Sequence, residues 1–521
     1  MPHPRPSRAL FLALLWLAWL AAAPADAQTR RPPGPPAGQA SGAAAPSQPG
    51  TPPAPDQLLP ADSVTSHSIT LAGRSIAYTA RTGALDLRSE QGEKSAEIFY
   101  TAYLATSADA RARPITFVFN GGPGAASAYL HLGALGPRVL DFGDGTQPPE
   151  GSARLVDNPD SWLDVTDLVF IDPVGTGYSH AMNSIRDVPK AFWGVNQDIQ
   201  ALEAAIRVAL TRLDRFGSPV YLVGESYGGF RGAKLVGRLP NDKGIAVAGA
   251  MLISPVIEFS LQSGDEFNPL PWALHLPAMA AVSLDRQGKL SPAALVPAER
   301  FALGDYLASL VAPPADPQAK QRLYATIADT IGLPREIVAR WAGRVPMAVF
   351  TKEIRHGEGE IVSNYDAAVG GSDPYPNSTF SRGSDPIFDG IMAPLTTGML
   401  AYIRDELGYK TERAYNLLNR EVAQKWEWGT RGPSGTVSAA DDMRKGLALN
   451  AQLRITIAHG MTDLVTPYLA SRYVVEHLPA KLTEGRVALA LHPGGHMMYL
   501  RPASRAALHA DGLALYGAVR E

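Results

Sequence analysis

A single serine stands between glycines at the point where an apolar run ends. The stretch VYLVGESYGG (220–229) contains the pattern G-x-S-x-G, with Ser226 at its centre. After a strand and before a helix, this pattern is typical of a nucleophile elbow, because the glycines tolerate a tight turn that presents the serine hydroxyl at the end of a sheet. The backbone N–H of Tyr227 then points to where an oxyanion would form. We therefore predict Ser226 as a nucleophile and Tyr227 as an oxyanion-hole donor.

A serine at its ordinary pKa needs a base, and the base needs an acid that orients it. Asp463 in ITIAHGMTDLVTP follows a late apolar run, and His496 in LALHPGGHMMYL follows the next. This is the chain order Ser, Asp, His that belongs to such an elbow. As alternatives, Asp463 could only cap a helix, and His496 could be an ordinary loop histidine. His459 is a rival base, but it precedes the acid in the chain, so we expect a structural role for it.

A second glycine cluster, FVFNGGPGAAS (117–127), follows an earlier apolar run. Its glycines Gly121, Gly122 and Gly124 would let backbone N–H groups approach a ligand, which suits the other half of an oxyanion hole. The alternative is a tight turn without a ligand. A phosphate-binding loop is excluded because no Lys-Ser/Thr follows.

The surrounding sequence predicts the elements that would hold these residues. PITFVFN, DLVFIDP, PVYLVGE and GAMLISP are short apolar runs that end in turn residues, as expected for strands buried on both faces of a sheet. SITLAGRSIAYTAR and SAEIFYTAYLA alternate like antiparallel strands. The stretch VNQDIQALEAAIRVALTRLDRF has helical spacing of its apolar residues. Strand and helix alternate, which predicts an α/β fold.

Composition limits the partners and the compartment. The chain has 521 residues, 45% of them hydrophobic, with 47 Lys and Arg against 50 Asp and Glu. Without a block of like charge, neither nucleic acid nor an anionic membrane is expected as a partner.

Arg5 and Arg8 precede the apolar run 9–23, and Ala25-Asp26-Ala27 supplies an A-x-A cleavage site, so we predict a signal peptide. The alternative is an uncleaved anchor. Since there is no cysteine, disulfides are excluded, which fits a periplasmic protein better than a eukaryotic secreted one.

The expected organisation has five parts. They are a signal peptide (1–27), a disordered Pro/Ala/Gly-rich linker (28–62), the first part of an α/β-hydrolase core (63–257), a helical cap insertion (258–443) and the second part of the core (444–521).

Five motifs together resemble the serine carboxypeptidases. They are NGGPG (120–124), DPVGTGYS (172–179), GESYGG (224–229), G-x-x-D (460–463) and GGHM (494–497). The resemblance implies an α/β-hydrolase fold with a mixed, mostly parallel sheet. It also assigns roles. Ser226, Asp463 and His496 would be the catalytic triad, Gly122 and Tyr227 the oxyanion-hole donors, and Asn120 and Glu225 the residues that bind the substrate's C-terminal carboxylate.

Glu225 would have to be protonated to bind a carboxylate. His496 must be neutral to act as a base, so we expect its pKa to be low enough for both states to coexist. The alternative for Glu225 is a hydrogen bond that only stabilises the elbow.

The chain departs from the family pattern at three positions. Val118 stands where the family usually has Trp, Ala125 where it has Cys, and Ala134 where a Glu supports the carboxylate network. We therefore expect carboxylate recognition to be weaker or rearranged.

The sequence as a whole predicts an exported serine carboxypeptidase, periplasmic or secreted. It would act on peptides with a free C-terminus, without metal or organic cofactor, and carries no signal of its oligomeric state. An esterase or acyltransferase with the same triad is the alternative enzyme, and a catalytically silent binding protein is the alternative class.

Overall fold

The structure is a computed structural model that describes residues 58–107, 109–147, 154–429 and 437–520. The predicted signal peptide and almost all of the predicted linker lie outside these residues. The described chain belongs to one compact unit, which begins slightly before the expected boundary at Ser63. Leu59 is already buried, and its N–H donates a 2.7 Å hydrogen bond to Oε2 of Glu97. Within the described ranges, no helix has both the length and the apolar character to cross a membrane.

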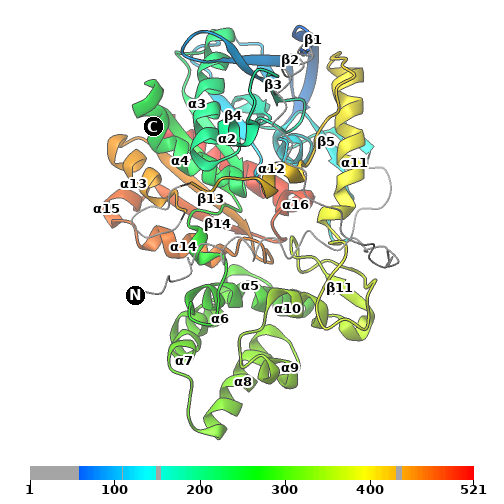
Figure 1. The fold of residues 1–521 in the computed structure, drawn as a ribbon, viewed down its shortest axis with the longest axis vertical. Helices are drawn as coiled ribbons and strands as arrows, with labels where there is room; N and C mark the ends of the chain where they lie inside the picture. The colour runs from blue at the N-terminus through cyan, green and yellow to red at the C-terminus, as the bar shows by residue number, and fades with distance from the viewer. Residues whose placement is uncertain (1–57, 108, 148–153, 430–436, 521) are drawn as a thin grey trace, which may run out of the picture. The chain divides into compact units, whose positions relative to one another are not determined.

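A mixed sheet forms the centre of the described chain (Figure 1). Its ten strands, counted over the described residues, are β1 (Ser63–Leu71), β2 (Arg74–Arg88), β3 (Lys94–Ala105), β4 (Ile115–Phe119), β7 (Asp167–Ile171), β8 (His180–Ala181), β9 (Val220–Glu225), β10 (Val247–Ile253), β13 (Arg454–Gly460) and β14 (Val487–His492). The order is β1-β2-β3-β7-β4-β9-β10-β13-β14, with β8 paired to β3. The pairs from β1 to β7 are antiparallel, and every pair from β7 onward is parallel. The predicted α/β fold with a mixed, mostly parallel sheet is confirmed.

The central strands bury both faces. Val220 and Leu222 of β9 enter one core together with α3 (Val195–Arg212) and α4 (Tyr227–Lys243). Tyr221 and Val223 enter a second core together with α16 (Pro502–Arg520). Burial on both sides explains why these strands read as continuous apolar runs. Since β4, β9, β10, β13 and β14 are parallel, the loops that follow them meet at one edge of the sheet.

Between β10 and β13 the described chain forms nine α-helices. They are α5 (Leu270–Arg286), α6 (Pro292–Phe301), α7 (Leu307–Val311), α8 (Pro317–Ile331), α9 (Arg335–Arg340), α10 (Met347–Glu353), α11 (Phe388–Ala401), α12 (Arg420–Gln424) and α13 (Ala440–Leu449). Figure 1 shows α5 to α10 gathered together, near α14 (Tyr468–Glu476), with which α5 is in contact. A short hairpin of β11 (Glu360–Val362) and β12 (Gly370–Ser372) joins them. We propose that residues 258–443, which hold most of these helices, act as a cap over the sheet edge.

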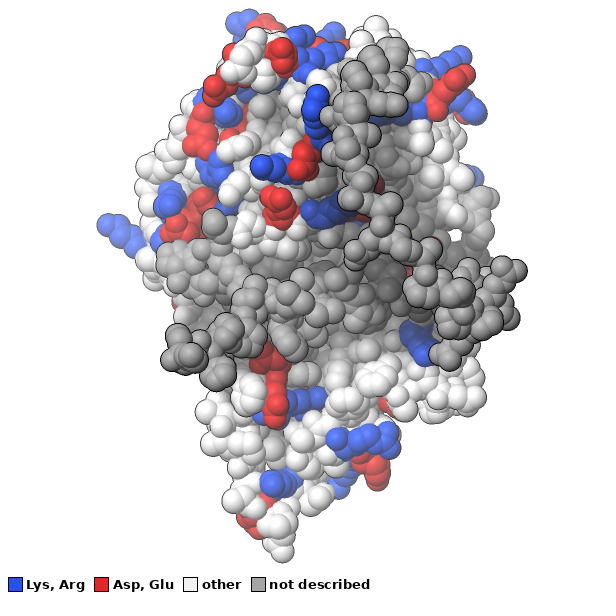
Figure 2. Space-filling model, in the orientation of Figure 1, with Lys and Arg blue, Asp and Glu red and all other residues white. Residues whose placement is uncertain are grey.

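One face of the described chain carries mixed charge. Figure 2 shows basic and acidic side chains interspersed on the face in view, without a large patch of one sign among the coloured residues. This distribution agrees with the nearly equal counts of basic and acidic residues in the sequence.

Candidate active site

The elbow at Ser226 is built from β9 and α4. Ser226 has φ 61° and ψ −123°, a backbone conformation that a non-glycine residue adopts only at a cost and that is common at functional sites. A Cβ on Gly224 would lie 2.0 Å from the Gly228 carbonyl oxygen, so the turn requires glycine there. The serine is half-buried and directly follows β9, the strand that lies between β4 and β10. The sequence predicted this strand, turn and helix.

The predicted oxyanion-hole segments are in direct contact. A Cβ on Gly121 would lie only 2.5 Å from the backbone nitrogen of Tyr227, and one on Gly228 would lie 2.4 Å from the Phe119 carbonyl oxygen. Tyr227 is the first residue of α4, so its N–H has no helical acceptor. Gly122, with φ +100°, follows in the neighbouring loop. The chain thus brings Gly121, which directly precedes Gly122, against the backbone nitrogen of Tyr227, the residue after Ser226.

The predicted acid and base are hydrogen bonded to each other. Oδ2 of Asp463 lies 2.9 Å from Nδ1 of His496, and both side chains are buried. Oδ1 of Asp463 accepts the backbone N–H groups of Val465 (2.8 Å) and Thr466 (3.0 Å). Asp463 therefore holds its own turn with one oxygen and contacts the histidine with the other. It does not cap a helix, because α14 (Tyr468–Glu476) has Pro467 at its N-cap.

The residues after β10 connect the base to the elbow. Oγ of Ser254 donates to the His496 carbonyl oxygen at 2.8 Å, and the N–H of Val256 lies 3.4 Å from the Ser226 carbonyl oxygen. The hydrogen bonds of the described residues do not include one between Ser226 and His496. Catalytic hydrogen bonds of this kind often form only when substrate is bound. His459, the rival base, is fully buried, and its Nε2 lies 2.8 Å from Oγ of Ser471.

Glu225 and Asn120, the predicted carboxylate-binding residues, contact each other. Nδ2 of Asn120 donates to Oε2 of Glu225, and Oδ1 of Asn120 accepts the N–H of Leu130 at 3.0 Å. Both side chains are about 3% exposed. Burial raises the pKa of Glu225 to about 7, although His496 and the hydrogen bonds from Tyr499 and Asn120 oppose this increase. A carboxyl group that keeps its proton near neutral pH can donate a hydrogen bond to a substrate carboxylate.

The pKa values of the acid and base reflect their pairing. Burial alone would lower the pKa of His496. The Asp463 carboxylate and, with a smaller effect, Glu225 raise it above its ordinary value. The pKa of Asp463 is below its ordinary value, because the attraction of His496 and the hydrogen bonds outweigh burial. The increase at His496 works against the expectation that its pKa is low enough for a neutral His496 and a protonated Glu225 to coexist. Since Glu225 and His496 influence each other, they titrate as a coupled pair.

Three residues at the site were not found from the sequence. Tyr499 contacts both oxygens of Glu225 at 2.9 Å. Oγ1 of Thr466 lies 2.7 Å from Oδ2 of Asp463 and 3.0 Å from Nδ1 of His496. Arg231 donates to the Asn120 carbonyl oxygen at 2.5 Å. Tyr499 and Thr466 each lie three residues after a predicted site residue, which is a local signal that could have identified them. Arg231 gives no such signal.

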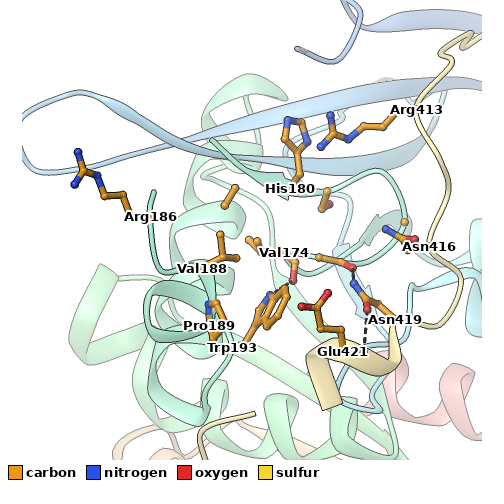
Figure 3. A pocket seen from close by; sticks show the side chains of 14 residues that line it. Val174, His180, Arg186, Val188, Pro189, Trp193, Arg413, Asn416, Asn419 and Glu421 are labelled. Atoms are coloured by element: carbon orange, nitrogen blue, oxygen red, sulfur yellow. Dashed lines mark hydrogen bonds between the residues drawn. The ribbon is translucent and has the colours of Figure 1, made fainter. Parts of the chain in front are cut away.

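A cavity of about 370 Å³ is lined by other residues of the described chain (Figure 3). It is lined by residues of the DPVGTGYS turn, by Trp193 and by Asn419, whose Nδ2 donates to the Gly175 carbonyl oxygen at 2.9 Å. The N–H of Asn419 donates to the Gly124 carbonyl oxygen at 2.8 Å, so this segment supports the glycine-rich loop from behind. None of the predicted site residues lines the cavity, and we therefore do not assign the chemistry to it.

Part of the chain matches a known protein family. Residues 77–267 match the family model described as serine carboxypeptidase. The matched range contains Asn120, Gly122, Glu225, Ser226 and Tyr227. It ends well before the predicted acid and base and covers less than half of the chain.

Relatives of known sequence have the same description. Serine carboxypeptidase-like 16 of Arabidopsis thaliana is 26% identical over 181 residues, which are 33% of this chain and 39% of that protein. Serine carboxypeptidase-like 29 of the same plant is 33% identical over 138 residues, which are 25% of this chain and 26% of that protein. The alignments thus span well under two thirds of these relatives. Among solved structures, the peroxisomal alpha-beta-hydrolase Lpx1 of Saccharomyces cerevisiae is 10% identical with a TM-score of 0.36, over 89% of this chain and 91% of that chain.

Proposed function

We propose that this chain is a serine carboxypeptidase that releases the C-terminal amino acid of peptides through an acyl-enzyme. The observation that carries the proposal is the buried, hydrogen-bonded pair of Asn120 and Glu225, of which Glu225 directly precedes the elbow serine. Hydrolysis of an ester or amide bond in general does not need a buried, proton-holding carboxyl group at this position. Recognition of a substrate carboxylate next to the scissile bond needs a group that can donate a hydrogen bond to it.

In the first half of the proposed reaction, Oγ of Ser226 attacks the carbonyl carbon of the last peptide bond, and His496 accepts the hydroxyl proton. The negative charge that develops on the carbonyl oxygen is stabilised by the N–H groups of Gly122 and Tyr227. His496 then donates the proton to the amine of the leaving amino acid, and the C–N bond breaks. Asp463 holds the imidazole in the tautomer that this exchange requires.

In the second half, water attacks the ester carbon of the acyl-enzyme while His496 accepts a proton from it. The proton then returns to Oγ of Ser226 as the shortened peptide is released. Glu225, in its protonated form, and Asn120 bind the α-carboxylate of the last residue in the first half, so cleavage is confined to the C-terminus.

We also propose export with cleavage after Ala27, a prediction that concerns residues outside the described part of the chain.

The test compares three substrates of one sequence: a peptide with a free C-terminus, its C-terminal amide and the corresponding simple ester. We expect the free acid to be cleaved with the lowest KM below pH 7, and labelling of Ser226 by a fluorophosphonate to abolish turnover of all three. A Ser226→Ala variant controls for contaminating hydrolases. If acid and amide have the same KM from about pH 4 to about pH 8, a range that spans the ordinary pKa values of Glu and His, the carboxypeptidase proposal is wrong.

Val118 and Ala134 favour a second candidate, an esterase or acyltransferase that uses the same triad. Both positions are fully apolar and buried in this structure, so neither supplies the polar support that the family pattern implied. Preference for the ester together with equal KM values for acid and amide would favour this candidate.

A further inference from the structure

Tyr499 is a buried tyrosine whose hydroxyl faces a single carboxyl group. It lies in the short 3₁₀ turn Met498–Leu500 (η9), three residues after His496. Its side chain has no exposed surface, and its hydroxyl oxygen is 2.9 Å from Oε1 and 2.9 Å from Oε2 of Glu225. Within the described residues, the hydrogen bonds to the Glu225 carboxyl come from Tyr499 and Asn120.

We propose that Tyr499 is a positioning residue for C-terminal carboxylate recognition: its hydroxyl fixes the orientation of the Glu225 carboxyl that meets the substrate. This inference rests on the proposed carboxypeptidase function and assigns to the chain a support for Glu225 that its apolar Ala134 does not provide.

The packing around the ring fixes the hydroxyl in place. A Cβ on Gly133 would lie 2.7 Å from Cε2 and 3.1 Å from Cδ2 of Tyr499, so the ring fills the space that any side chain at position 133 would need. Gly133 belongs to the π-helical turn His131–Leu135 (η3), whose residues are all buried. A ring held on one side by η3 and joined at its hydroxyl to Glu225 has little freedom to move. The Glu225 carboxyl is thus held at both oxygens: Asn120 contacts Oε2, and the Tyr499 hydroxyl contacts Oε1 and Oε2.

The charge at Glu225 makes this role measurable. The titratable groups that act on or respond to Glu225 are His496, Asp463, Tyr129, Tyr365 and Tyr499. A hydroxyl that donates to a carboxylate stabilises the ionised form. Removal of the Tyr499 hydroxyl therefore raises the pKa of Glu225 further. The protonated, carboxylate-binding form then persists to higher pH, although it is less well oriented.

The decisive variant is Tyr499→Phe, assayed on a peptide acid and on the amide of the same peptide. Loss of one buried hydrogen bond should raise KM for the acid by about 2- to 10-fold below pH 7, with KM for the amide and kcat for both substrates little changed. The alkaline rise in KM for the acid should move to higher pH. Tyr306→Phe is the matched control, because its buried hydroxyl donates one 2.8 Å hydrogen bond to the Gly343 carbonyl oxygen in the insertion.

Gly133→Ala is a second variant that keeps the hydroxyl but displaces the ring. It should raise KM for the acid selectively, as Tyr499→Phe does, and fluorophosphonate labelling of Ser226 checks that both variants are folded. An equal change for acid and amide, or an unshifted alkaline rise in Tyr499→Phe, would overturn the inference while the carboxypeptidase proposal stands. If the unmutated enzyme itself does not distinguish acid from amide, the proposed function fails, and the inference fails with it.

Discussion

Asp463 reaches His496 through a 2.9 Å hydrogen bond between Oδ2 and Nδ1, while its other oxygen holds the turn after β13. The carboxylate is fully buried, so the surrounding chain and not solvent determines its orientation. A carboxylate in this position keeps Nδ1 protonated and leaves Nε2 free to exchange a proton with a serine hydroxyl. Thr466 lies beside the same two atoms and contributes to their alignment.

The first prediction concerns the proposed triad of Ser226, Asp463 and His496. Ser226→Ala and His496→Ala should each lower kcat by many orders of magnitude, and Asp463→Asn by roughly 10⁴-fold, because the three residues act as a unit. Turnover of a peptide acid measured in the same buffer would test this. His459→Gln is the control, since His459 contacts Ser471 instead. Near-normal turnover in His496→Ala with loss of turnover in His459→Gln would exchange the two roles.

The second prediction concerns the contact between the two segments of the proposed oxyanion hole. In Gly121→Ala the new methyl group would lie 2.5 Å from the Tyr227 nitrogen and 2.8 Å from the Glu225 carbonyl oxygen, so the segments must separate. Displacement of one donor should lower kcat by about 10²- to 10³-fold. Gly357→Ala is the control, because nothing lies within 4 Å of its new methyl group. An unchanged kcat in Gly121→Ala would mean that these segments do not form the oxyanion hole.

A third prediction concerns a buried ion pair behind Asn120. Arg231 donates to both carboxylate oxygens of Asp198, at 2.7 Å and 3.0 Å, and to the Asn120 carbonyl oxygen. Arg231→Met leaves Asp198 buried without its partner, which should lower the free energy of unfolding by about 3–5 kcal/mol. Denaturant unfolding measures this loss.

The double variant Arg231→Met/Asp198→Leu separates stability from recognition. It should recover much of the stability, since no buried charge is left unpaired. It should still show a raised KM for peptide acids, because the Asn120 backbone has lost its donor. A KM equal to that of the unmutated enzyme would limit Arg231 to stability alone.

The sequence predicted the residues whose position follows from local pattern and chain order. The elbow at Ser226 needs only a strand, a tight turn and a helix, and the parallel strands that precede Asp463 and His496 deliver both to one sheet edge. The α/β fold followed from the alternation of apolar runs with helical stretches.

The supporting contacts could not be predicted in the same way. Tyr499 meets Glu225 across 274 positions of sequence, and Arg231 meets Asn120 across 111. Such contacts depend on the register of packed elements and on side-chain orientation, which no local pattern encodes. The raised pKa of His496 was not predicted for the same reason, since it depends on the nearby Asp463 and Glu225.

The fourth prediction concerns pH. Glu225, with a pKa of about 7, is protonated in mild acid and loses its proton as the pH rises. KM for a peptide acid should therefore increase above about pH 7. On the acid side, protonation of His496 removes the base and lowers kcat/KM. Glu225→Gln keeps a donor that cannot ionise, so the alkaline increase in KM should disappear. The peptide amide should lack this increase even with the unmutated enzyme, and an amide that shows it would refute the role of Glu225.

The last prediction concerns stability and Asp172, a buried residue of the DPVGTGYS turn. Its Oδ1 accepts the N–H of Ser127 at 2.7 Å, and Tyr415 lies 3.4 Å from Oδ2. Burial raises the pKa of Asp172 from 3.8 to about 7. Between these values the folded protein holds a proton that the unfolded chain has released, so the free energy of unfolding falls as pH rises through this window and is constant above about pH 7.

Asp172→Asn removes this proton uptake while it keeps an acceptor for Ser127. The free energy of unfolding of the variant minus that of the unmutated protein should therefore be larger at about pH 8 than at about pH 5, by about 1–4 kcal/mol. Denaturant unfolding at the two pH values measures the difference, and Glu225, which changes in the same direction, is present in both proteins and cancels. Asp305→Asn, at an exposed position, is the control and should show no such difference. A constant gap between Asp172→Asn and the unmutated protein at both pH values would show that Asp172 is ionised in the folded state throughout. An Asp172 carboxylate that is always charged would then stabilise the N–H of Ser127, at the start of the segment that follows the glycine-rich loop, at every pH. Its ionisation would not lower the free energy of unfolding as the pH rises.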